Sequence, residues 1–215
     1  MAGAATGLLS LGAFDLAGMT SARAQSAMTP DEALQKMMDG NKRYTEGRLT
    51  VFDEDLAILK QKTAEGQEPF AAVLACADSR LPVELIFDQS IGHLFVTRVA
   101  GNVATAEMIA SLEYGVAVLG ARTIMVLGHS NCGAVKATIA AKAAPGQISA
   151  LYSYIRPAVD QAGSDVDTVA RANVKNQVAI LSEASPVLAE YIAKKNLSVV
   201  GGFYDLASGA VSLQS

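Results

Sequence analysis

Short apolar runs recur along the chain and predict buried β-strands. The run at 69–76 contains no polar residue, which is typical of a strand covered on both faces of a parallel sheet. Three further runs, at 94–99, 123–127 and 196–203, are strand candidates of similar length. Because segments with helical periodicity lie between these runs, the pattern predicts an α/β fold with a mainly parallel central β-sheet flanked by helices.

Helical spacing of apolar residues predicts three helices between the strands. They cover 104–119, 132–141 and 168–184. The segment at 204–213 contains turn-forming residues after the last strand candidate, and we expect it to form a small hairpin at the edge of the sheet.

Two more helices are predicted before the first strand. Thr29 can cap the first of them, and Glu32 completes a capping box with it. The second helix is expected over 54–64, with Leu56 and Leu59 facing inward.

Residues 1–28 differ from the rest of the chain. They are rich in Ala, Gly and Leu, and the triplet 22–24 is the small-x-small pattern that a signal peptidase cuts. We therefore expect an export signal and a periplasmic or exported protein. The alternative is a disordered tail on a cytoplasmic protein. The remainder, 29–215, is expected to form one domain, because it has no internal repeat or low-complexity linker.

The composition narrows the classes of function. The chain has 215 residues, of which 51% are hydrophobic, so it can bury a large core. Its net charge is -4 and it has no run of Lys and Arg, which argues against a nucleic-acid partner. No apolar stretch is long enough to be expected to span a membrane.

The scarce cysteines and histidines gather in two polar segments that each follow a predicted strand. Cys76 ends the strand at 69–76, and His129 and Cys132 follow the strand at 123–127. Two thiolates and one imidazole suit Zn²⁺, and three protein ligands leave its fourth position open, as in catalytic zinc sites. His93, the other histidine, is expected to be an ordinary surface or half-buried residue.

Other interpretations of the two cysteines remain open at this point. Both could be small buried side chains, or they could form one structural disulfide, which an exported protein would favour. A redox protein is a further alternative, although the close Cys-x-x-Cys spacing is missing.

An acidic and a basic residue stand next to the first cysteine. Asp78 can accept a hydrogen bond from a zinc-bound hydroxide, and Arg80 can keep Asp78 ionised through a bidentate pair. Zinc lowers the pKa of a bound water from about 15.7 towards 7, so hydroxide would exist at neutral pH. The alternative is a surface ion pair of little energetic weight.

These motifs resemble those of the β-class carbonic anhydrases. The resemblance covers about residues 30–213, and the segments that carry it are Cys-Ala-Asp-Ser-Arg at 76–80, 85–89, 94–102, Gly-His-Ser-Asn-Cys-Gly at 128–133, and 199–205. It implies a zinc enzyme that reversibly hydrates carbon dioxide to bicarbonate and a proton. It also implies a homodimer or a dimer-based tetramer in which an N-terminal helical arm embraces the partner.

The resemblance also implies roles for single residues. Cys76, His129 and Cys132 would hold the zinc ion. Asp78 would either pair with Arg80 or, in an inactive state, become the fourth zinc ligand. Gln89 would hydrogen-bond a substrate oxygen from across the cleft.

Two alternatives to CO2 hydration remain. Carbonyl sulfide and carbon disulfide share the linear electrophilic carbon of CO2, so a zinc hydrolase of such an analogue would use the same motif residues. A non-catalytic protein that binds zinc or bicarbonate is the other alternative. It would be expected to have lost the Asp78–Arg80 pair, which is present.

Overall fold

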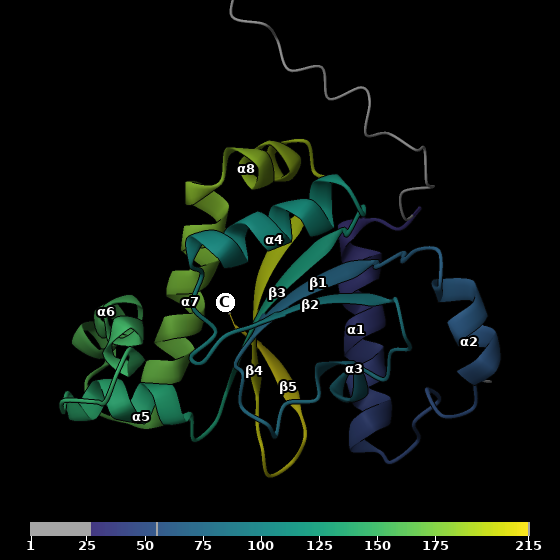
Figure 1. The fold of residues 1–215 in the computed structure, drawn as a ribbon. Helices are drawn as coiled ribbons and strands as arrows, with labels where there is room; N and C mark the ends of the chain where they lie inside the picture. The colour runs from purple at the N-terminus through teal and green to yellow at the C-terminus, as the bar shows by residue number, and fades with distance from the viewer. Residues whose placement is uncertain (1–26, 55, 215) are drawn as a thin grey trace, which may run out of the picture.

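The computed structural model describes residues 27–54 and 56–214 (Figure 1). Most of the predicted export segment therefore lies outside the described residues. The core of the fold is a five-stranded sheet with the order β2-β1-β3-β4-β5. Its strands are β1 (Ala71–Ala75), β2 (Leu94–Arg98), β3 (Thr123–His129), β4 (Ser198–Tyr204) and β5 (Val211–Gln214). The first four strands pair in parallel and β5 is antiparallel to β4.

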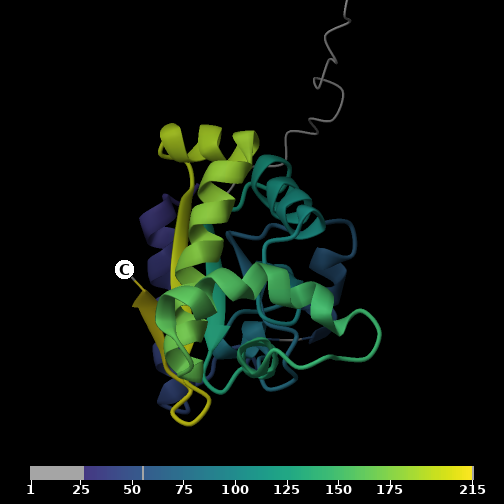
Figure 2. The ribbon, with the colours of Figure 1, turned by 90° about the vertical axis from the view of Figure 1, so that its left-hand side faces the viewer.

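Helices cover both faces of this sheet. They are α1 (Pro30–Thr45), α2 (Leu56–Thr63), α3 (Val83–Ile86), α4 (Ala106–Ala117), α5 (Gly133–Ala140), α6 (Tyr152–Ala162), α7 (Val166–Ala184) and α8 (Pro186–Ala193), with a short 3₁₀ helix at Ile148–Leu151. α4 packs on β1 and β2, and α7 packs on β3 and β4. Figure 2 shows α1 and α7 on opposite sides of β4.

The alternation of side chains along each strand divides the core into two layers. In β1, Ala72 and Leu74 pack in the layer that contains residues of α4, α7 and α8, whereas Val73 packs in the layer that contains residues of α1. β3 follows the same rule in register, since Val73 is paired with Met125 and both belong to the α1 layer. All five residues of β1 are buried, as expected for a strand covered on both faces.

The fold class predicted from the sequence is confirmed. The four predicted parallel strands and the edge hairpin are present, and their bounds differ by only a few residues from those expected. Three α-helices were missed, namely α3, α6 and α8. α6 contains Pro157, which lacks an amide hydrogen and is a poor helix-interior residue, so its sequence does not resemble a helix.

The N-terminal helices differ in how they contact the rest of the chain. α1 has the predicted capping box between Thr29 and Glu32, and Asn41 ties it to α3 and to the β4–β5 hairpin. α2 has no buried residue, and Figure 1 shows it apart from the sheet. The inward orientation predicted for Leu56 is wrong, since 53% of the residue is exposed.

Within the part of the chain that the structure describes, no helix has the length and apolar character needed to cross a bilayer.

Candidate metal centre

The candidate site lies where the connections of the sheet change direction. The chain leaves β1 for β2 on one side and returns to β3 on the other side, so β1 and β3 are neighbours whose following loops diverge. Such a switch point opens a crevice at the carboxyl ends of the strands. Cys76 directly follows β1, and His129 is the last residue of β3. Sheet topology thus brings together two segments that are far apart in the sequence.

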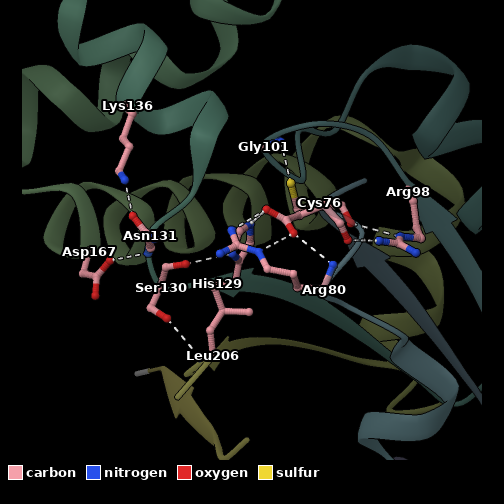
Figure 3. Close-up of polar contacts among 11 residues, drawn as sticks. Cys76, Arg80, Arg98, Gly101, His129, Ser130, Asn131, Lys136, Asp167 and Leu206 are labelled. Carbon is pink, nitrogen blue, oxygen red and sulfur yellow. Dashed lines mark hydrogen bonds and ion pairs between the residues drawn. The ribbon is translucent and has the colours of Figure 1, made fainter. Parts of the chain in front are cut away.

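Cys76 is held in a buried position by its neighbours. Only 4% of the residue is exposed, and its Sγ accepts a hydrogen bond of 3.2 Å from the backbone N–H of Gly101 (Figure 3). Gly101 has a φ of +80°, a conformation that favours glycine. A Cβ at this position would also lie 2.6 Å from Cδ1 of Ile155. The loop after β2 therefore needs a glycine to present its amide to the sulfur.

The His129 ring is completely buried and has a defined orientation. Its Nδ1 lies 2.9 Å from the carbonyl oxygen of Ser130, which can only accept, so Nδ1 carries the proton of this hydrogen bond. Nε2 therefore keeps its lone pair, and it has no hydrogen-bond partner in the described structure. A buried ring nitrogen without a partner is expected where a metal ion completes its coordination.

Cys132 reaches the site from the start of a helix. It is the N-cap residue of α5 and is 1% exposed. The tight turn before it passes through Asn131, whose φ is +58° and whose amide donates to Asp167 over 2.8 Å. This turn directs Cys132 back towards the end of β3. The His-x-x-Cys spacing thus serves a strand-to-helix turn, as the sequence suggested.

The three donor atoms lie close enough to share one ion. The Sγ atoms of Cys76 and Cys132 and a ring nitrogen of His129 are all within 4.8 Å of one another. Both cysteines are free thiols, so the structure contains no disulfide between them. Two sulfurs and one imidazole nitrogen match the donor set of Zn²⁺, and the residues present therefore fit this metal.

The electrostatics of the two thiols also favour a cation. A hydrogen bond from the Cys132 thiol lowers the pKa of Cys76 to about 4. The same hydrogen bond, together with burial, raises the pKa of Cys132. The isolated pair thus favours one thiolate beside one thiol. A divalent cation would allow both sulfurs to ionise, because it offsets their mutual repulsion in a buried place.

Asp78 and Arg80 form a bidentate ion pair beside the thiols. Arg80 donates from Nε to Oδ1 over 2.9 Å and from Nη2 to Oδ2 over 2.7 Å. This pairing holds the pKa of Asp78 far below the usual carboxyl range. Oδ2 of Asp78 lies 4.0 Å from Nε2 of His129, so the carboxylate stands next to the donor cluster but is hydrogen-bonded to Arg80.

Gln89 is placed in a different environment. It is buried, and its Nε2 donates to the carbonyl oxygen of Phe87 over 2.9 Å. It lines a pocket of about 730 Å³ together with residues such as Phe52 and Ile91. The structure of one chain does not bring Gln89 to the donor cluster, and its role towards substrate stays a prediction. His93 is half-buried beside Phe70, as expected of an ordinary residue.

Sequence reasoning missed residues that support the site from other elements. Arg98, at the end of β2, donates to the carbonyl oxygens of Cys76 and Asp78 and so braces the loop after β1 (Figure 3). Asn173 of α7 donates to the carbonyl oxygen of Gly101. For Asn173, the signal available in the sequence was an amide side chain on a helix face that was expected to be apolar.

Comparisons with known proteins point to one family. The family model described as carbonic anhydrase matches residues 71–211. Carbonic anhydrase 2 of Mycobacterium tuberculosis is 36% identical over 199 residues, which cover 86% of this chain and 93% of the relative. The carbonic anhydrase of Mycolicibacterium smegmatis is 35% identical over 194 residues, with coverage of 86% and 94%.

Solved structures share the fold. The β-carbonic anhydrase of Coccomyxa, solved in complex with acetazolamide, superposes with a TM-score of 0.67 at 28% sequence identity. The superposition covers 84% of this chain and 85% of that chain.

Metal analysis tests the donor cluster directly. We expect the purified protein to contain about one zinc ion per chain by mass spectrometry, because three suitable donors converge. His129→Ala should lower the zinc content to about a tenth or less, since two sulfurs alone make a poor tetrahedral site. His93→Ala, which changes the other histidine, should keep the zinc content of the wild type. Full zinc in His129→Ala would contradict the assignment.

Proposed function

This chain belongs to the β-carbonic anhydrase family, and from that premise we propose that it catalyses the reversible hydration of CO2 to bicarbonate and a proton. Zinc held by Cys76, His129 and Cys132 is the cofactor of this proposal. The observation that carries it is the convergence of these three donors within 4.8 Å, next to the paired carboxylate of Asp78.

Asp78 has the central role among the protein groups. A zinc ion at the cluster would supply a Lewis acid that makes water acidic enough to react at neutral pH. An ionised carboxylate can only accept hydrogen bonds. Asp78 therefore accepts a hydrogen bond from a water-derived O–H group beside the cluster. Because the hydrogen of that group points to the carboxylate, the lone pairs of its oxygen face CO2.

Arg80 keeps Asp78 in that role. Its two hydrogen bonds occupy both carboxylate oxygens and hold the negative charge in place. An unpaired carboxylate at this distance could itself become a fourth ligand, which would block the site. The ion pair between Asp78 and Arg80 is thus proposed as the open, active arrangement. Its presence also argues against a protein that only binds zinc or bicarbonate.

Self-association belongs to the same proposal. Phe52, Leu56 and Ile91 are large apolar residues that are 75%, 53% and 47% exposed, and they surround the pocket of about 730 Å³ that Gln89 lines. Clusters of exposed apolar side chains of this kind are typical of protein interfaces. A homodimer or a dimer-based tetramer that covers this surface would place a second chain next to α2 and Gln89.

Export is proposed from the sequence alone. The apolar segment before residue 25 and its small-x-small triplet at 22–24 support cleavage by a signal peptidase after Ala24. Expression in a bacterium with a periplasm, followed by intact-mass measurement of the periplasmic fraction, should find a chain that begins at Gln25. A full-length chain that stays in the cytoplasm would refute the proposal.

Substitution of Asp78 tests the catalytic role. Asp78→Asn keeps the shape of the side chain but makes it a hydrogen-bond donor as well as an acceptor, and it weakens the pair with Arg80. We expect kcat/KM for CO2 hydration, measured by stopped flow, to fall by about 100-fold or more, the usual range for a lost proton-positioning group. Zinc content should not change.

The control is Asp160→Asn, which makes the same change at an exposed position of α6 and should keep the wild-type rate. A parallel assay with carbonyl sulfide compares kcat/KM for the two substrates. A higher value for carbonyl sulfide would identify the sulfur analogue as the main substrate. Full activity of Asp78→Asn with zinc bound would show that the proposed role is wrong. A wild-type protein that binds zinc but does not hydrate CO2 would refute the function itself.

Light scattering tests the proposed self-association. We expect the wild-type protein to have about two or four times the mass of a single chain, as a dimer or a dimer-based tetramer would. Phe52→Glu places a charge on the apolar surface and should shift the population towards a single chain, because burying an unpaired charge in an interface is costly. Ile148→Glu, on the 3₁₀ helix and also exposed to solvent (48%), should leave the mass unchanged. A wild-type monomer would contradict the proposal.

A further inference from the structure

Two amide side chains of α7 are buried next to the loop that supports Cys76. Asn173 and Gln177 stand one helical turn apart, and both are completely buried. Burying an amide costs free energy unless its hydrogen bonds are satisfied. Leu or Val at these two positions would stabilise the packing of the helix on the core more than unsatisfied amides would. Asn173 and Gln177 are therefore expected to form hydrogen bonds with polar groups that an apolar side chain would leave unsatisfied.

That partner is the loop between β2 and α4. Nδ2 of Asn173 donates to the carbonyl oxygen of Gly101 over 2.9 Å, and Oε1 of Gln177 accepts from the amide of Ala104 over 2.9 Å. Nε2 of Gln177 also donates to Oδ1 of Asn173 over 3.1 Å. This last bond fixes which way the Asn173 amide faces, so that its NH2 group points to Gly101.

Gly101 links this amide pair to the sulfur. Its N–H donates to Sγ of Cys76, and its carbonyl oxygen accepts from Asn173. A glycine with a φ of +80° has wide backbone freedom, and its two peptide groups can turn independently. The hydrogen bond from Asn173 of α7 to the Gly101 carbonyl restricts that freedom and keeps the amide directed at the Cys76 sulfur. Figure 3 shows this amide facing the sulfur.

We propose that Asn173, oriented by Gln177, is a positioning residue of the metal centre that holds the Gly101 amide on the Cys76 sulfur. The inference rests on the proposed zinc site. An N–H···S hydrogen bond draws negative charge from the thiolate, so the sulfur donates less charge to a bound metal. With two thiolates in the donor set, this bond keeps the metal a stronger Lewis acid, and it also holds the Cys76 side chain in place for binding.

Cobalt substitution gives a readout that does not depend on catalysis. Asn173→Asp has the same shape but replaces the donor to Gly101 with an oxygen, which repels the carbonyl. In the cobalt(II) protein, the sulfur-to-metal charge-transfer band of this variant should move to longer wavelength, because the thiolate has lost its hydrogen bond. Competition with a chromophoric chelator should show zinc affinity about 10- to 100-fold weaker, as is usual when the support of a metal ligand is removed.

Asn176→Asp is the matched control. It introduces the same charge on the same helix, and Nδ2 of Asn176 has no hydrogen-bond partner in the described structure. Its band position and zinc affinity should equal those of the wild type. A merely structural role for Asn173 would lower the thermal unfolding temperature of Asn173→Asp and leave the band of the folded protein unmoved. That result would overturn the proposal.

A second variant covers the case in which Asn173→Asp does not fold. Gln177→Glu keeps the acceptor for Ala104 but removes the donor that orients Asn173, and it should move the band in the same direction by a smaller amount. An unmoved band in Gln177→Glu would then count against the inference. The proposed function is tested separately, since a wild-type protein without CO2 hydration activity would leave the band comparison intact.

Discussion

Cys76 and Cys132 bring their sulfur atoms within 4.8 Å of each other and of a His129 ring nitrogen, in a place almost closed to solvent. Two thiolates so close repel each other strongly in a medium of low dielectric constant. Only a bound cation makes the fully ionised arrangement favourable. The groups around the site reflect this constraint, because each either positions a donor atom or stabilises the negative charge next to it.

Two arginines and one backbone amide stabilise the groups of the site by hydrogen bonds, although none of them is a metal ligand. Arg80 holds the Asp78 carboxylate, and Arg98 donates to the carbonyl oxygens of Cys76 and Asp78. The Gly101 amide is directed at the Cys76 sulfur. The Asp78 carboxylate and the Cys76 sulfur therefore each have a fixed donor. Such an arrangement leaves the protein little reorganisation to perform when charge develops during a reaction.

Much of the fold could be predicted from local patterns. The strand β1 was recognisable because a run without polar residues suits burial on both faces. The start of α1 was recognisable because a capping box acts within four residues. α6 was missed because Pro157 hides its helical character, and Leu56 was misplaced because α2 buries none of its residues against the chain. Periodicity reports an apolar face, but it does not say what covers that face.

The sequence by itself determined the donor types, their order along the chain and the strands that carry them, because each of these depends on residues close in sequence. Only the folded chain shows that Arg98 of β2 reaches the carbonyl oxygens of Cys76 and Asp78, and that Asn173 of α7 reaches the loop at Gly101. These contacts depend on side-chain orientation and on helix packing across the sheet. No spacing within one segment encodes them, since they arise only when separate segments are brought together by burial of the core.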